Sequence, residues 1–148
     1  MQILPDHTAA ASAAGSRLVR LLGPRRGILR RRRGLDEGER ALVAMVAARE
    51  AHHHAIAQAY ARRAMAVLGD DFAVALVLEE GLAAPLTGRI GALADAAGAL
   101  AQNPPRLGPA QTRRLKAQRL DADELADLFV TVALVQANLH RAAAVPDA

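Results

Sequence analysis

Three adjacent histidines, His52 to His54, follow Glu50 in the alanine-rich stretch R-E-A-H-H-H-A-I-A-Q-A-Y. Carboxylates and imidazoles are the groups that most often perform acid–base catalysis or bind metal ions. Neighbouring residues of a helix point about 100° apart, so the three histidines cannot all reach one ion from a regular helix. Only Glu50 with His53 or His54 has the spacing of three or four residues that places two side chains on one face.

A single Glu-x-x-His pair does not make a metal site. Carboxylate-bridged di-iron bundles use two such pairs and further glutamates, and this chain has no second pair. We therefore predict no metal and no other cofactor. Since His53 shares an apolar face with Ile56 and Tyr60, it can equally be a buried or interface histidine that has one hydrogen-bond partner, whereas His54 is expected to be solvated.

Acid–base chemistry is the reaction type that the sequence leaves open. Four residues are candidate catalytic groups, in a site that can also be inactive: Glu39, Glu50, His53 and Tyr60. The chain has no cysteine, which excludes thiol catalysis, thiolate metal ligands and disulfides. No serine lies near the histidines and there is no glycine-rich phosphate loop, so neither a serine triad nor a nucleotide site is indicated.

These candidates must be positioned by helices, because apolar residues recur at spacings of three and four and no alternating strand pattern occurs. The fold class is therefore all-α, with about five to six helices. A helix follows Asp36 and reaches Leu68, either continuous or broken near the histidines, and Gly69 ends it; a shorter helix covers 71–80. Further helices are expected after Thr87 as N-cap, from Pro109 to Leu115, and from a capping pair, Asp121 and Glu124, to about Ala144.

We expect residues 1–34 to form a flexible, basic N-terminal segment with a short helix over 16–22, and residues 35–148 to form the helical domain. The segment carries six arginines that could contact an anionic partner: Arg25, Arg26, Arg30, Arg31, Arg32 and Arg33. Simple solvation of these arginines is the alternative. A nucleic-acid partner is less favoured, because no aromatic residues accompany the arginines and the net charge is only +4.

The longest apolar run, 41–48, is much shorter than the roughly 20 residues of a membrane span, and no leader pattern precedes it. We expect a protein without membrane association, located in the cytoplasm. With 52% hydrophobic but only 2% aromatic residues, its core must be built from aliphatic side chains and closely packed helices.

The order of these segments resembles the carboxymuconolactone decarboxylase superfamily, in particular its alkylhydroperoxidase D-like, peroxidase-related branch. The similarity is clearest in A-A-P-L-T-G-R-I-G-A-L-A-D-A-A-G-A-L-A-Q-N-P-P (83–105). It continues through R-L-K-A-Q-R-L-D-A-D-E-L-A-D-L-F-V-T-V-A-L-V-Q-A-N-L-H-R (114–141), which includes most of the expected final helix. The stretch G-E-R-A-L-V-A-M-V-A-A-R-E (38–50) is similar to the helix that precedes the active site of that family.

The resemblance implies an alkylhydroperoxidase D-like helical bundle in a homo-oligomer, which is a trimer, dimer or hexamer. Peroxidase members carry Cys-x-x-Cys followed four residues later by histidine, and a relay glutamate that corresponds to the region of Glu39. Three registers place that motif within 50–60, on His52, Ala55 and Ala59, on Glu50, His53 and Ala57, or on His53, Ile56 and Tyr60. None of them supplies a cysteine, so thiol peroxidase activity is not expected.

Two functions follow from the resemblance. The chain is either an oligomeric binding protein with a vestigial pocket near His53 and a small-molecule ligand, or an acid–base enzyme of carboxymuconolactone decarboxylase type that uses Glu50 and the histidines. The sequence alone leaves open whether any catalysis survives.

Overall fold

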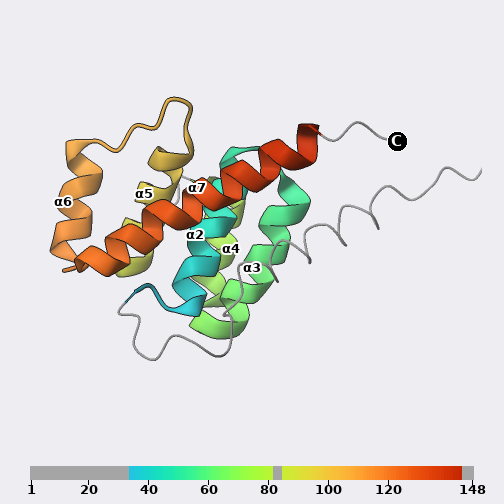
Figure 1. Ribbon diagram of the computed structural model, residues 1–148. Coiled ribbons are helices and arrows are strands. Elements are labelled where there is room, and N and C mark those ends of the chain that lie inside the picture. The colour runs from blue at the N-terminus through green and yellow to red at the C-terminus, as the bar shows by residue number, and fades with distance from the viewer. Residues whose placement is uncertain (1–33, 82–84, 145–148) are drawn as a thin grey trace, which may run out of the picture.

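A computed structural model of the protein describes residues 34–81 and 85–144. These residues form six helices and no strand, as Figure 1 shows. The helices are α2 (Glu37–Glu50), α3 (His54–Leu68), α4 (Asp71–Glu80), α5 (Gly88–Ala101), α6 (Pro109–Ala117) and α7 (Ala122–Ala144). The predicted all-α class is confirmed, whereas the short helix expected over 16–22 and the six arginines lie outside the described residues.

Helix α2 is the centre of the bundle. It contacts α3, α4, α5 and α7, and in Figure 1 the long helix α7 lies across it. Eight consecutive residues, from Ala41 to Ala48, are buried, and the largest of them, Leu42 and Met45, have no exposed surface. A helix that is apolar on all sides is stable only when neighbours cover every side. The apolar run 41–48 is therefore explained by the position of α2.

Small residues let the other helices approach the centre closely. Helix α5 buries two glycines and five alanines besides Leu93 and Leu100. Between α2 and α3, a Cβ atom added to Gly38 would lie only 2.7 Å from Leu68 Cγ. A core with few aromatic residues is thus closed by short distances between backbones rather than by large side chains.

The helix is interrupted between α2 and α3, so residues 37–68 form two helices rather than one continuous helix. His52 adopts φ 62°, in the left-handed region that residues other than glycine rarely occupy. The His53 N–H still donates to the Ala48 carbonyl oxygen at 3.0 Å, and α3 starts at the next residue. At the other end of α3, Gly69 adopts φ 68° and ends the helix as predicted.

Two helices begin with reciprocal caps: the pair predicted at Asp121 and Glu124 is confirmed, and Asp36 with Glu39 forms a second one that was not predicted. The Asp36 carboxylate accepts from the Glu39 N–H at 2.8 Å, and the Glu39 carboxylate accepts from the Asp36 N–H at 3.1 Å. Asp121 and Glu124 repeat this arrangement at the start of α7, with both distances 2.8 Å. Each pair satisfies two N–H groups that have no partner within the helix.

Three residues differ from what their types and spacing favour: Thr87, a good capping residue, and two phenylalanines in apolar helix patterns. Thr87 occupies the N-cap position of α5 as predicted, but its hydroxyl makes no capping hydrogen bond, and the next residue, Gly88, adopts φ 69°. Phe72 is 77% exposed, since α4 packs through the opposite side that carries Ala73, Val74 and Val77. Phe129 is 45% exposed, because it lies beside rather than on the face of α7 that is buried.

None of the helices formed by residues 34–81 and 85–144 combines the length and the apolar character needed to cross a lipid bilayer.

Candidate functional site

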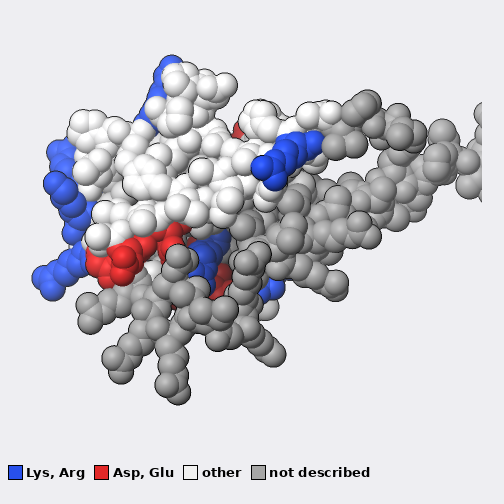
Figure 2. Space-filling view, in the orientation of Figure 1, with Lys and Arg blue, Asp and Glu red and all other residues white. Residues whose placement is uncertain are grey.

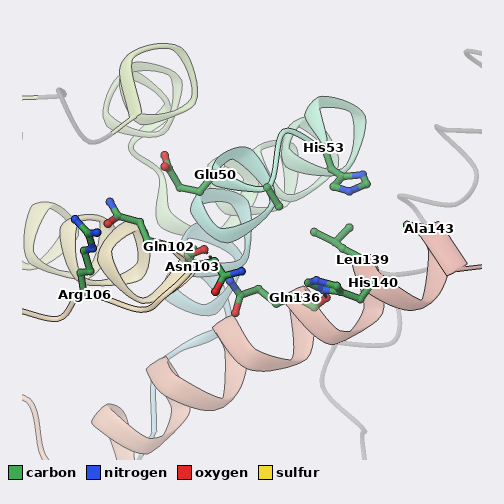
Figure 3. A pocket seen from close by; sticks show the side chains of 11 residues that line it. Glu50, His53, Gln102, Asn103, Arg106, Gln136, Leu139, His140 and Ala143 are labelled. Carbon is green, nitrogen blue, oxygen red and sulfur yellow. Dashed lines mark hydrogen bonds between the residues drawn. The ribbon is translucent and has the colours of Figure 1, made fainter.

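An open pocket of about 600 Å³ lies where the α2–α3 junction meets the ends of α5 and α7. Figure 3 shows the side chains that line it. Its volume is within the range of roughly 300–1,000 Å³ that is usual for small-molecule sites. The lining residues are Glu50, Ala51, His53, Ala101, Gln102, Asn103, Arg106, Gln136, Leu139, His140 and Ala143.

The α2–α3 junction brings His53 to the pocket. His53 is the residue immediately before α3, and its side chain makes no capping bond to the first turn. It is half-buried, whereas His52 and His54 on either side are exposed. Because the helix is broken at this point, only one of the three adjacent histidines faces the pocket, and the expectation that His54 is solvated is confirmed.

Helix α7 contributes a second imidazole. His140 Nδ1 lies 2.8 Å from the carbonyl oxygen of Gln136, one turn earlier. Since a carbonyl oxygen only accepts, this contact requires a proton on Nδ1, and Nε2 of the neutral ring is then left as an acceptor. In Figure 3 the His53 and His140 rings lie on opposite sides of Leu139.

The end of α5 and the segment after it form the third wall. Gln136 Nε2 donates to the Ala101 carbonyl oxygen at 2.8 Å and so ties α7 to the end of α5. The Arg106 N–H donates to the Ala99 carbonyl oxygen at 2.9 Å, which fixes the returning segment against the helix. The Arg106 guanidinium has no ion-pair partner among residues 34–81 and 85–144, so it remains available to an anion.

Two of the four predicted catalytic residues, Glu50 and His53, line this pocket, but they do not form a catalytic pair. Figure 3 shows their side chains pointing in different directions. The Glu50 carboxylate lies 3.3 Å from Arg49 Nη1. Arg49 in turn donates to the carbonyl oxygens of Leu78 and Glu79 at the end of α4, at 2.7 and 2.8 Å. The electrostatic partner of Glu50 is therefore an arginine that also holds a helix end.

The third candidate, Glu39, lies at the opposite end of α2 from the pocket. Its carboxylate is buried and accepts hydrogen bonds from Arg89 of α5, one of them at 3.2 Å. Arg89 Nη2 also donates to Glu124 of α7 at 2.6 Å. The hydrogen bond with Glu39 is the main cause of a raised pKa of Arg89. Arg89 thus links Glu39 of α2 to Glu124 of α7, and Glu39 makes no hydrogen bond to any of the other three candidates among the described residues.

The fourth candidate, Tyr60, is a core residue with 2% exposure. Burial raises the pKa of Tyr60 far above its usual value, and the nearby Arg63 offsets this only in part. A phenol in this environment stays protonated at neutral pH and cannot accept a proton from a ligand. The predicted convergence of Glu39, Glu50, His53 and Tyr60 is therefore limited to Glu50 and His53.

Several pocket residues were not predicted from the sequence as site residues: Gln102, Asn103, Arg106, Gln136 and His140. Gln136 and His140 are four residues apart on the final helix, a spacing that places both on one face. Arg106 follows the two prolines that end α5 and carries no sequence signal of its own. Their convergence depends on how α5, α7 and the α2–α3 junction pack.

Within residues 34–81 and 85–144, no group of three or more histidine, aspartate or glutamate side chains is close enough to hold a metal ion. Comparisons with protein-family models, with curated proteins and with solved structures found no match to this chain.

Proposed function

We propose that this protein binds a small carboxylate-bearing molecule in the pocket between the α2–α3 junction, α5 and α7. The observation that carries the proposal is the pair of imidazoles, His53 and His140, in one pocket with the guanidinium of Arg106. The Arg106 guanidinium and the His53 imidazole can donate to an anion, and His140 can do so when its Nε2 is protonated. The only carboxylate among the described lining residues, that of Glu50, is already paired with Arg49. The pocket thus favours an anionic over a cationic ligand.

We place the chain, as part of the same proposal, in the alkylhydroperoxidase D-like branch of the carboxymuconolactone decarboxylase superfamily, as a cytoplasmic homo-oligomer. Support comes from the helix order and from the position of the histidines, which lie at the end of the helix that resembles the one before the family's active site. Because the chain has no cysteine, this member does not reduce hydroperoxides through a thiol. The pocket is what remains of the site, adapted to binding.

Calorimetric titration with a panel of small aliphatic and aromatic carboxylic acids tests the binding proposal. Arg106→Gln and His53→Ala should each lower the affinity for the best ligand by about 10- to 100-fold, since a hydrogen bond to a charged group contributes roughly 1.5–3 kcal/mol. Arg113→Gln and His54→Ala are matched controls, because both residues are exposed and neither lines the pocket. Binding that is equally strong in all four variants would contradict the proposal, as would the absence of any carboxylate ligand.

The acid–base enzyme is the second candidate, and the free Nε2 of His140 favours it. Incubating the same protein with lactones and keto acids, and following the products by mass spectrometry, separates the two functions. A pure binding protein leaves the panel unchanged. Turnover that is lost in His53→Ala or His140→Ala but retained in His54→Ala would instead assign catalysis to the pocket.

A further inference from the structure

Helix α7 is apolar on two opposite faces, and the described part of the chain covers only one of them. The covered face packs on α2 and α5 through buried residues that include Leu128, Val132, Val135 and Leu139. On the other face, Val130 is 53% and Leu134 45% exposed. Ala126, Ala133 and Ala137 are also exposed and continue this face along the helix at spacings of three and four.

Charge marks the two ends of this exposed face. Asp123 lies at its start and Arg141 at its end, and both are exposed. They are eighteen residues apart, which is about five helical turns or roughly 27 Å, so both side chains project on the side of Val130. Neither has an ion-pair partner among residues 34–81 and 85–144. In Figure 2 the surface along α7 is mostly uncharged, with acidic groups near its beginning and a basic group near its end.

We infer that this face binds the same face of a second copy, with the two α7 helices antiparallel about a two-fold axis. A two-fold axis at the level of Val132 pairs Asp123 with the partner's Arg141. The same axis pairs Val130 with the partner's Leu134, so the charged and the apolar contacts are satisfied in one register. In an interface of this kind each contact occurs twice.

The alternative orientation is disfavoured by charge. Parallel helices in register would place Asp123 beside the partner's Asp123 and Arg141 beside the partner's Arg141, and like charges in contact repel. The alanines at 126, 133 and 137 allow the two helix backbones to approach closely, as the small residues of α5 do within the bundle. This inference rests on the self-association proposed above, and it is independent of what the pocket binds.

The apolar part of the interface is tested by sedimentation velocity and native mass over a range of concentrations. The unaltered chain should form dimers, and Val130→Lys should weaken dimerisation at least about tenfold, because each dimer would bury two lysines. Val67→Lys is the control, since Val67 is similarly exposed, at 48%, but lies on α3. Circular dichroism verifies that both variants are folded.

The register is tested by charge reversal. Asp123→Arg or Arg141→Asp alone should weaken the dimer severalfold, because each creates two like-charge contacts, and the double variant should restore it. Mixing the two single variants should likewise restore association. An effect on helix stability alone predicts the opposite, since each reversal places the wrong sign at a helix end and the double variant would be the least stable.

Three outcomes would overturn the inference, and they are distinguishable. A chain that is monomeric at all concentrations contradicts both the proposed oligomer and the α7 contact. An oligomer that is insensitive to Val130→Lys contradicts the α7 contact alone. An oligomer that Val130→Lys dissociates but the double reversal fails to restore contradicts the antiparallel register. A larger assembly in which the double reversal does restore association supports the α7 pairing as one of its contacts.

Discussion

Arg89 on α5 donates hydrogen bonds to the carboxylate of Glu39, a residue of α2 that is only 7% exposed. The same guanidinium reaches Glu124 at the start of α7. Both carboxylates also accept from the backbone N–H of a helix N-cap residue, Asp36 or Asp121. One arginine therefore connects the starts of α2 and α7.

Replacing Arg89 should destabilise the fold. Arg89→Met leaves the buried Glu39 carboxylate without its cation and should lower the free energy of unfolding by about 2 kcal/mol, measured by urea denaturation. The loss is smaller than for a fully buried pair, because a third of the Arg89 side chain is exposed. Adding Glu39→Gln should recover part of it by removing the unpaired charge. Arg113→Met, at an exposed position, is the control; an equal loss there would contradict the assignment.

Tyr60 makes the stability depend on alkaline pH. Its pKa is raised in the folded protein, so above pH ~10 the unfolded chain loses this proton while the folded chain keeps it. The folded state then binds more protons, and stability should fall as pH rises, by up to about 1.4 kcal/mol per pH unit. Tyr60 is the only tyrosine in the chain, which makes phenolate absorbance near 295 nm specific for it. Phenolate formation near pH 10 while the protein remains folded would refute the burial effect, and Tyr60→Phe should remove this part of the pH dependence.

His52 holds an unfavourable backbone conformation at the α2–α3 break. With φ at 62°, glycine should be better tolerated than histidine, and we expect His52→Gly to stabilise the protein by about 0.5–1 kcal/mol in thermal or urea unfolding. Gln58→Gly is the control, at an exposed position inside α3, and it should lower the free energy of unfolding by a similar amount. Destabilisation in both variants would mean that the imidazole of His52 stabilises the folded state by more than its backbone conformation destabilises it.

Gly38 sets the distance between α2 and α3. Gly38→Ala places a methyl group 2.7 Å from Leu68 Cγ, and we expect a loss of about 1–3 kcal/mol despite the better helix propensity of alanine. Leu68→Ala alone should also destabilise, by removing a packed side chain. In the double variant the new methyl group occupies part of the vacated space. The loss of unfolding free energy in the double variant, measured by urea denaturation, should therefore be smaller than the sum of the losses in the two single variants. Strictly additive losses would mean that residues 38 and 68 are not in contact.

The sequence alone determined the secondary structure and several helix ends. Periodicity identifies helices, because it depends only on local spacing. Helix ends were marked by Asp36, by the Asp121–Glu124 pair, by Pro109 at a first turn and by Gly69 after α3, all of which act through neighbouring backbone groups. Such local rules hold whatever the helices later contact. The absence of cysteine from these 148 residues is likewise read from the sequence without a structure.

Only the tertiary structure decided which residues share a site. Glu39 carries the same carboxylate as Glu50, and Tyr60, like His53, is a residue type used in proton transfer. Packing nevertheless buries Tyr60 and pairs Glu39 with Arg89 from another helix. His140 and Arg106 enter the pocket because helices distant in sequence meet there. Which side of a helix is covered depends in the same way on its neighbours. This is why Phe72, apolar and regularly spaced, is exposed, and why α7 has a second apolar face.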